Sequence, residues 1–438
     1  MNTIIKSITK RFLLGLCLSS LLAFSVISNS ATNLADAPIF STNSVPGNVA
    51  LVISAEFPTA LGSAYTSGYS SAVDYIGYFD SKKCYVYNTN ADINKNYFTP
   101  SGAATAARTC VSKWSGNYLN WALTQTVDPF RYALTGGYRS VDEVNLTVLE
   151  KAWASGQGGS VRTQIITANV ATVTPYAWAG AKIRIAGLGN KFYISNGGLN
   201  TSGGTVTPAN PIVTPTGVQP NDPTGTRVYE FFARVKVCES AANIEANCQP
   251  YGTNFKPEGL IQKNALKLNF GAFGYLNDSN KQRDGGVLRA KMAPLGPFKT
   301  DPGSINVVNP TPEWDAGTGI FRINPDQASA TASGVSNSGV INYLNKFGLN
   351  TPGYKTFDPV GELYYTAIRY FKNQGNVASY ISAATTAHKD GFPVINFAAG
   401  IEADDPIKYS CQANFVIDRK STRLNSSHST LSRMPSSA

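Results

Sequence analysis

The acidic and basic side chains that could carry out catalysis are few and widely spaced in this sequence. Glu56, Asp74 and Asp80 could serve as paired carboxylates for general acid–base chemistry, but their spacing alone implies no mutual geometry. The chain has two histidines, His388 and His428, and His428 lies in a C-terminal segment of unusual composition. A lone histidine such as His388 is more often structural than catalytic. These residues therefore do not predict an active site.

Established catalytic motifs are also missing from the sequence. No serine stands in a G-x-S-x-G turn, and neither H-E-x-x-H nor a P-loop occurs. Residues 156–159 (GQGG) are rich in glycine, but they lack the lysine and the spacing of a phosphate-binding loop, so they indicate a plain turn. We predict that the protein has no catalytic residues and no cofactor and is not an enzyme. A secreted hydrolase or carbohydrate-active enzyme is the alternative.

One stretch offers oxygen ligands for a metal ion. Residues 278–285 (DSNKQRDG) combine acidic and amide side chains with a turn. They lack the glutamate of a calcium-binding loop, and they include Lys281 and Arg283, whose charges oppose cation binding. We therefore predict no metal site in this stretch.

The cysteines indicate an oxidising compartment. Beyond Cys17 there are five, and none has the C-x-x-C spacing of zinc or redox sites. We propose two disulfides and one unpaired thiol, although spacing leaves other pairings open: Cys84 with Cys110, Cys238 with Cys248, and Cys411 unpaired.

The N-terminus has the order of a secretory signal peptide. Lys6, Lys10 and Arg11 precede an apolar run over residues 12–27, and small residues follow at 28–31. An uncleaved membrane anchor is the alternative, but the run is shorter than the roughly 20 residues of a spanning helix. We predict a signal peptide over residues 1–31 and an exported mature chain.

The net charge of +10 comes mostly from the two ends of the chain. Residues 1–31 and residues 418–438 each contribute +3, which leaves +4 for residues 32–417. This nearly balanced body gives no electrostatic footprint for nucleic acid. Only 15% of the residues are charged, which is typical of a secreted or cell-surface protein.

The last residues differ in character from the body. Residues 414–417 (NFVI) look like the start of a buried strand, and the basic, serine-rich segment 418–438 follows them abruptly. A natural disordered terminus is one interpretation. We favour a non-native tail, with a natural sequence that continues the strand past Ile417.

Hydrophobic patterns predict the elements that hold these residues. Val49–Ser54 has the composition of a buried strand. Asp128 and Pro129 predict the N-cap and first residue of a helix that ends at Gly136, and residues 147–154 predict a further helical piece. An earlier helix is indicated by four residues at helical spacing: Leu119, Ala122, Leu123 and Thr126.

The middle and the C-terminal parts differ in their periodicity. Alternation predicts four strands, at 182–185, 191–194, 229–238 and 266–275, with a turn at 196–198 and a long loop over 200–225. Two later helices are predicted at 340–347 and from Asp358 and Pro359 onward. The second of these has an apolar stripe made of Val360, Leu363, Tyr364, Ala367, Ile368 and Phe371. We predict a mixed α/β body in three segments, with a β-rich insertion in the middle: 32–159, 160–260 and 261–417.

Several strings resemble a known family in their order along the chain. The combination resembles the N-terminal half of the PilY/PilC-type type IV pilus biogenesis proteins, which act as pilus tip adhesins. The strings that carry the resemblance are VPGNVALVISAEFPTA (45–60), YIGYFDSKKCYVY (75–87), WSGNYLNWALTQTVDPFRYALTGG (114–137), TVLEKAWASGQGG (147–159), SGVINYLNKFG (338–348), DPVGELYYTAIRYFKN (358–373) and CQANFVI (411–417).

The resemblance implies a fold and a function. It implies a von Willebrand factor A-like α/β region, a role in pilus assembly and twitching motility, and a place at the pilus tip, the outer membrane surface or outside the cell. The implied partners are pilus subunits, minor pilins and a host or abiotic surface. Relatives carry calcium in a C-terminal propeller, which none of the matching strings covers, so no cofactor is expected here.

One departure from the resemblance concerns a metal site. Metal-binding von Willebrand A domains place D-x-S-x-S after their first strand, whereas this chain has Ser54-Ala55-Glu56-Phe57-Pro58. The leading aspartate and both later hydroxyls are missing, and a hard divalent ion needs several oxygen ligands. We predict no metal site here and place the adhesive surface elsewhere, in the loops of residues 160–225.

Overall fold

The computed structural model describes residues 45–157, 162–196, 199, 212–213, 228–239, 244–277, 283–350, 352–357 and 359–419. The predicted signal peptide and residues 420–438 of the predicted tail lie outside the described residues. The described residues belong to one compact unit, and its fold is described by itself. It is mixed α/β, as the sequence predicts.

A four-stranded sheet contains the first and the last described strands. Its order is β16-β15-β1-β19, and β1 runs parallel to both of its neighbours while β16 is antiparallel to β15. The apolar run after Pro46 forms β1, every residue of which is buried, so the predicted strand is confirmed. The bounds are β1 Gly47–Ile53, β15 Leu268–Gly274, β16 Val287–Ala293 and β19 Asn414–Arg419.

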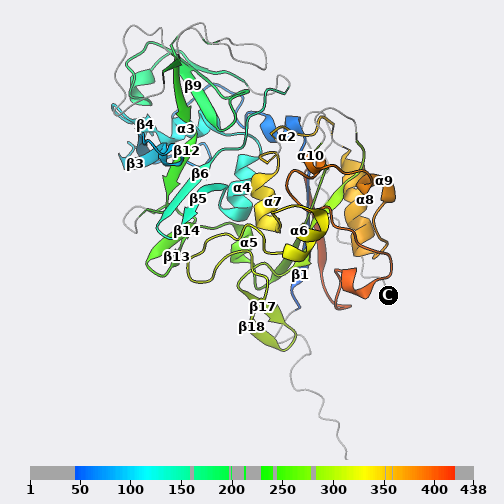
Figure 1. The fold of residues 1–438 in the computed structure, drawn as a ribbon. Coiled ribbons are helices and arrows are strands. Elements are labelled where there is room, and N and C mark those ends of the chain that lie inside the picture. Colours follow the sequence, from blue (N-terminus) through cyan, green and yellow to red (C-terminus); the bar gives the residue numbers. More distant parts are fainter. Residues whose placement is uncertain are drawn as a thin grey trace, which may run out of the picture. The chain divides into compact units, whose positions relative to one another are not determined.

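Helices α7 (Val340–Lys346) and α8 (Val360–Phe371) cover opposite faces of this sheet (Figure 1). Side chains alternate across a strand. Val49 and Leu51 of β1 therefore join the core cluster that contains α7, whereas Ala50 and Val52 join the cluster that contains α8. A strand buried on both faces explains why its sequence is continuously apolar.

The predicted apolar stripe of α8 faces the sheet. Leu363, Ala367 and Phe371 are buried against β1 and its neighbours. Thr366 and Tyr370 are buried as well, and the Thr366 hydroxyl donates to the Gly286 carbonyl at 3.0 Å. Of the predicted helix start, Asp358 lies outside the described residues, and the helix begins at Val360.

A six-stranded sheet has the order β4-β2-β3-β12-β6-β5. The predicted helical piece over 147–154 is wrong, because residues 147–150 belong to β6, which pairs antiparallel with both β5 and β12, and residues 151–154 are not helical. Strand β12 lies between β3 and β6, so a strand from the predicted insertion completes a sheet formed by the preceding segment. The bounds are β2 Lys83–Asn88, β3 Tyr97–Ala103, β4 Trp114–Ser115, β5 Arg139–Glu143, β6 Leu146–Glu150 and β12 Arg234–Val237.

A five-stranded sheet has the order β10-β11-β9-β8-β7. The single strand predicted over 229–238 is in fact two strands. The strand is interrupted at Ala233, whose N–H donates to the Asn190 carbonyl at 2.9 Å. The two strands on either side of it, β11 and β12, belong to different sheets. The bounds are β7 Gln164–Ile166, β8 Ala181–Arg184, β9 Lys191–Ser195, β10 Ile212–Val213 and β11 Val228–Phe232.

Two short helices, α3 (Gly116–Leu123) and α4 (Asp128–Thr135), follow β4. Thr126 lies outside α3, because the helix ends at Leu123. Asp128 is the first residue of α4 and not its N-cap: its carboxylate accepts hydrogen bonds from the N–H groups of Gln125 and Ala152, at 2.9 and 2.8 Å. Gly136 ends α4 in the left-handed conformation, with a φ of 85°.

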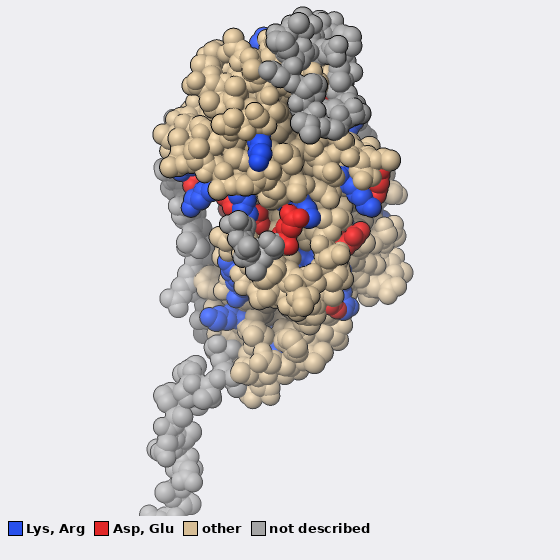
Figure 2. Space-filling model, turned by 90° about the vertical axis from the view of Figure 1, so that its left-hand side faces the viewer, with Lys and Arg blue, Asp and Glu red and all other residues tan. Residues whose placement is uncertain are grey.

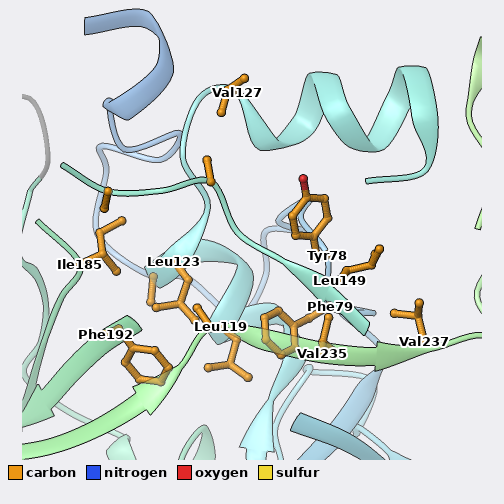
Figure 3. Close-up of a cluster of buried hydrophobic side chains, with 14 of the residues drawn as sticks. Tyr78, Phe79, Leu119, Leu123, Val127, Leu149, Ile185, Phe192, Val235 and Val237 are labelled. Carbon is orange, nitrogen blue, oxygen red and sulfur yellow. The ribbon is translucent and has the colours of Figure 1, made fainter. Parts of the chain in front are cut away.

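The main core joins these elements. Figure 3 shows part of it, where Leu119 and Leu123 of α3, Phe192 of β9 and Val235 of β12 come together. Each fully buried apolar side chain of this size contributes roughly 1.5–3 kcal/mol. The remaining elements are α2 Phe57–Leu61, η1 Ile93–Lys95, η2 Val170–Thr172, β13 Cys248–Tyr251, β14 Asn254–Pro257, α5 Leu260–Lys263, β17 Phe298–Asp301, β18 Ser304–Val308, α6 Gln327–Ser333, α9 Ala378–Ile381, α10 Thr386–Lys389 and η4 Glu402–Asp404.

Two disulfides link neighbouring strands and loops. Cys84 is bonded to Cys110, and Cys238 is bonded to Cys248, with a Cα–Cα distance of 5.7 Å in each pair. Cys411 is a free, exposed thiol just before β19. The structure thus contains the pairing proposed from the sequence.

Candidate functional site

The carboxyl ends of β1 and β15 bring polar side chains together. The two strands are parallel and in register from Gly47 with Leu268 to Val52 with Phe273, so both end at the same edge of the sheet. Ser54 and Tyr275 follow them there, and the Ser54 Oγ lies 3.4 Å from the Tyr275 hydroxyl. In open sheets with parallel strands, ligands bind beyond this edge. It is the candidate site.

Glu56 supplies the acidic group at this edge. Its side chain is buried, with 1% of the residue exposed, and its carboxylate accepts a hydrogen bond from the Ser54 hydroxyl. The carboxylate therefore faces the interior of the domain, next to the end of β1.

Lys355 supplies the basic group, from a segment far away in the sequence. It forms an isolated parallel β-bridge with Glu56, and the Phe57 N–H donates to its carbonyl at 2.9 Å. Its ammonium donates to the Arg283 carbonyl and lies 5.7 Å from the centroid of the Tyr275 ring. Only 2% of Lys355 is exposed, so a charged group is buried at the strand ends.

A small pocket adjoins these residues. Ala55, Tyr275 and Lys355 line one part of it, and aromatic side chains and the carboxylate of Asp390 line the rest. Asp390 accepts a hydrogen bond from the Gly348 N–H at 2.5 Å. The pocket thus combines an apolar wall with a few charged groups, which is a composition suited to binding.

Arg289 is the second buried cation of the pocket. Its Nη1 donates to the Lys389 carbonyl at 3.0 Å and its Nη2 donates to the Tyr275 carbonyl at 2.5 Å. The guanidinium lies 5.5 Å from the centroid of the Tyr343 ring, and burial raises the pKa of the Tyr343 hydroxyl. These contacts hold β16 against the loop after α10, so the role of Arg289 is chiefly structural.

The residues at this edge do not fit a divalent ion. Ser54 and Glu56 offer one hydroxyl and one carboxylate, and the carboxylate already accepts the serine hydroxyl. The buried ammonium of Lys355 adds a positive charge to the same place. A hard divalent ion needs more oxygen ligands and no competing cation. The absence of a cofactor stays a prediction.

The carboxylates singled out in the sequence do not meet. Asp74 lies 3.5 Å from Arg108 and Asp80 lies 3.7 Å from Lys83, and neither pair is at the end of β1 with Glu56. Asp74 and Asp80 therefore each have a basic partner, and Glu56 lies separately at the end of β1.

The other candidates from the sequence have structural roles or are not described. His388 is part of the capping box of α10, where Thr385 accepts its backbone N–H. Of the metal-like stretch 278–285, residues 278–282 lie outside the described residues, as do residues 158–159 of the glycine-rich turn. Of the predicted adhesive loops over 160–225, residues 160–161, 197–198, 200–211 and 214–225 lie outside them too.

One group of potential metal ligands occurs among the described residues. Cys238, Glu245 and Cys248 have ligand atoms within 4.8 Å of one another. The two cysteines form a disulfide, and the Glu245 carboxylate lies 2.6 Å from the Lys83 ammonium. The bond and the ion pair account for this cluster without a metal.

Sequence reasoning missed Lys355, Arg289 and Asp390. The strings around Lys355 and Asp390, such as GYKTF, have the composition of surface loops, Arg289 lies in a strand, and nothing local marks a buried charge. Only the long-range pairing of the chain brings these residues to the end of β1.

The described surface does not have a dominant charge on the face drawn in Figure 2. Lysine, arginine, aspartate and glutamate side chains are interspersed there among a majority of uncharged residues. This agrees with the nearly balanced charge of the body. No helix among the described residues has the length and apolar character needed to cross a membrane.

Comparison with known proteins identifies relatives along most of the chain. Residues 66–206 match a family described as PilY1 homolog, small alpha/beta domain. The chain is 40% identical over 428 residues to a type IV pilus biogenesis factor PilY1 homolog of Xylella fastidiosa strain Temecula1, a match that covers 91% of this chain and 34% of the relative. A second protein of that strain with the same name is 23% identical over 348 residues, covering 68% of this chain and 22% of the relative.

The chain thus spans about a third or less of the length of these curated relatives. No solved structure matches it significantly.

Proposed function

This chain is a relative of the PilY1-type type IV pilus biogenesis factors, and from this premise we propose that it is an exported pilus assembly factor and tip-associated adhesin that acts by binding. The observation that carries the proposal is the 40% identity to a pilus biogenesis factor over 91% of the chain. Two disulfides and the predicted signal peptide support export, because disulfides persist in oxidising compartments.

The proposed fold of the central sheet is von Willebrand factor A-like. The order β16-β15-β1-β19, with β1 parallel to both neighbours and helices α7 and α8 on opposite faces, supports this assignment. A region of this kind presents loops beyond the carboxyl ends of its strands, which is a suitable platform for binding a partner.

The proposed partners are pilus subunits and minor pilins, together with a host or abiotic surface at the pilus tip or outer membrane. Support comes from the names of the relatives, which are those of pilus biogenesis factors. The interspersed surface charge favours contact through uncharged polar and aromatic residues over contact with nucleic acid.

Binding is proposed in preference to hydrolysis. A glycoside hydrolase typically uses two carboxylates that flank the bond to be cleaved. The acids nominated by the sequence lie apart, and the buried Glu56 is engaged by Ser54. The candidate edge of the sheet therefore supports recognition better than it supports general acid–base catalysis.

The test is deletion of the encoding gene, with piliation, twitching and surface attachment as readouts. We expect fewer pili and reduced twitching, and recovery of both when the gene is supplied in trans. Normal pili together with unchanged attachment would overturn the proposal. Turnover of a polysaccharide by the purified chain, lost in Glu56→Gln, would favour the hydrolase instead.

A further inference from the structure

The polar cluster at the carboxyl end of β1 contains a cation that belongs to the chain itself. Lys355 is 2% exposed and Glu56 is 1% exposed, and the two residues form an isolated parallel β-bridge. Burying an ammonium or a carboxylate costs several kcal/mol unless an opposite charge and hydrogen bonds compensate. The two charges are therefore expected to persist only as a compensated group.

The surrounding groups complete a closed polar site. The Ser54 hydroxyl donates to Glu56, and the Tyr275 hydroxyl lies 3.4 Å from the Ser54 Oγ. The Lys355 ammonium donates to the Arg283 carbonyl and stands 5.7 Å from the centroid of the Tyr275 ring. A hydroxyl, a carboxylate, a phenol and a carbonyl thus surround the place where parallel strands end.

We infer that the Lys355 ammonium is a built-in cation at the end of β1, in the place where a metal-binding von Willebrand A domain would hold a divalent ion. The ammonium adds a buried positive charge at the end of β1, where the buried Glu56 carboxylate accepts the Ser54 hydroxyl. It differs from an ion in that it cannot dissociate, because its four-carbon stem is anchored in the backbone.

This arrangement has a mechanical consequence. In a site filled by an exchangeable ion, the loops around the ion are held together only when the ion is bound. Here the β-bridge of Glu56 and the hydrogen bond from the Phe57 N–H to the Lys355 carbonyl, at 2.9 Å, join the segment 352–357 to the end of β1. The edge of the sheet is therefore fixed independently of calcium or magnesium concentration. This inference goes beyond the pilus role and does not depend on it.

The experiment compares the melting temperature of the full chain in EDTA with that in excess Mg²⁺, Mn²⁺ or Ca²⁺. We expect no difference for the wild-type chain. Lys355→Ala removes the ammonium and leaves a space beside Glu56, so it should lower the melting temperature in EDTA by more than about 2 °C. Divalent cations should not restore this loss, because Ser54 and Glu56 supply too few oxygen ligands for a hard ion. Glu56→Gln added to Lys355→Ala should restore part of it, because the uncompensated carboxylate disappears.

Lys291→Ala is the matched control. Lys291 lies on β16 of the same sheet, its side chain is 44% exposed, and its ammonium is 3.5 Å from Asp404. Its removal should leave the melting temperature independent of divalent cations.

Three results would overturn the inference. The first is a wild-type chain whose melting temperature rises with a divalent cation and loses that rise in Glu56→Gln. The second is a Lys355→Ala chain as stable as the wild type. The third is a destabilised Lys355→Ala chain whose stability Glu56→Gln does not restore even in part.

A second comparison covers a Lys355→Ala chain that does not fold. Lys355→Met keeps most of the side-chain volume but leaves the Glu56 charge uncompensated, so Lys355→Met with Glu56→Gln should melt at a higher temperature than Lys355→Met alone. If the double variant melts no higher, the inference is wrong.

Discussion

The Lys83 ammonium lies 2.6 Å from the Glu245 carboxylate, and this ion pair connects the two disulfide-closed loops. Lys83 precedes Cys84 directly, and Glu245 lies inside the loop closed by Cys238 and Cys248. The second oxygen of Glu245 accepts the Cys238 N–H at 2.8 Å. Both side chains are largely buried, with exposed fractions of 11% and 9%.

Breaking this ion pair should destabilise the fold strongly. Lys83→Met leaves a buried carboxylate without its ammonium, and we expect a loss of about 3–5 kcal/mol in the free energy of unfolding. Adding Glu245→Gln to Lys83→Met should recover part of that loss, because the uncompensated charge disappears. Denaturant titration of the single and double variants measures both quantities.

The exposed pair of Lys95 and Asp92 serves as the control. The Lys95 ammonium lies 3.9 Å from the Asp92 carboxylate, and the two side chains are 53% and 47% exposed. Lys95→Met should therefore lower the free energy of unfolding by less than about 1 kcal/mol. An equal loss in Lys83→Met and Lys95→Met would contradict the role of the buried pair.

The two disulfides should stabilise the fold to different degrees. Their cysteines are 26 and 10 residues apart, and chain-entropy arguments give about 3.5 and about 2.7 kcal/mol for loops of these lengths. Replacing Cys84 and Cys110 by serine should therefore lower the free energy of unfolding more than replacing Cys238 and Cys248.

Peptide mapping without reductant provides an independent check of the pairing. We expect both bridges to be intact and Cys411, which is free and exposed, to be alkylated in the native chain. A bridge from Cys411 to Cys84 would overturn the pairing.

Glu313 should make stability depend on pH. Its buried carboxylate accepts the N–H groups of Val340 and Ile341 at the start of α7, at 2.6 and 2.7 Å. Burial raises its pKa to about 7, although the two N–H groups oppose that rise. The ordinary value of 4.5 applies in the unfolded chain.

Between about pH 4.5 and about pH 7, the folded chain therefore binds more protons at Glu313 than the unfolded chain does. Its contribution is most favourable below this window, declines as the pH rises through it, and is constant above it, a change on the order of 3 kcal/mol. Glu313→Gln should remove this part of the slope. Urea titrations across the window test it, and the same slope in both chains would show that Glu313 does not titrate there.

The outer edge of β19 should promote self-association. Among the described residues, β19 pairs on one side only, with β1, and Phe415 and Ile417 are 37% and 40% exposed. An apolar strand edge is a template for pairing with another chain. We expect a polypeptide of residues 45–419 to form oligomers in light-scattering measurements, and Ile417→Lys to reduce them.

Ile93→Lys tests whether the effect is specific to that edge. Ile93 lies in η1 and is 54% exposed, so its substitution should leave the oligomers unchanged. A polypeptide of residues 45–419 that is monodisperse and melts cooperatively would show that the edge is harmless.

Local patterns in the sequence were sufficient to predict the elements whose buried faces repeat with a regular period. The run VALVI predicted β1, because a strand covered on both faces needs apolar residues at every position. Leu363, Ala367 and Phe371 predicted α8, because a helix that covers a sheet repeats its apolar side every three to four residues. The cysteine spacing and the balanced body charge pointed to an exported binding protein.

The tertiary structure decided what depends on partners far away in the chain. Residues 147–154 look helical by themselves, but β5 and β12 take up the backbone hydrogen bonds of residues 147–150, which belong to β6. The interruption of the strand at Ala233 could not be predicted from the sequence either. The alternation of apolar and polar residues continues across it, although the two strands belong to different sheets.

The candidate site shows the same division most clearly. Ser54 and Glu56 were visible in the sequence as the residues that follow the first strand, and their pattern argued against a metal ion. Lys355 was not visible, since a lysine in a loop is ordinarily exposed. Only the folded chain places its ammonium in the interior, because the energy of burying a charge depends on which opposite charge and which hydrogen bonds the fold brings to it.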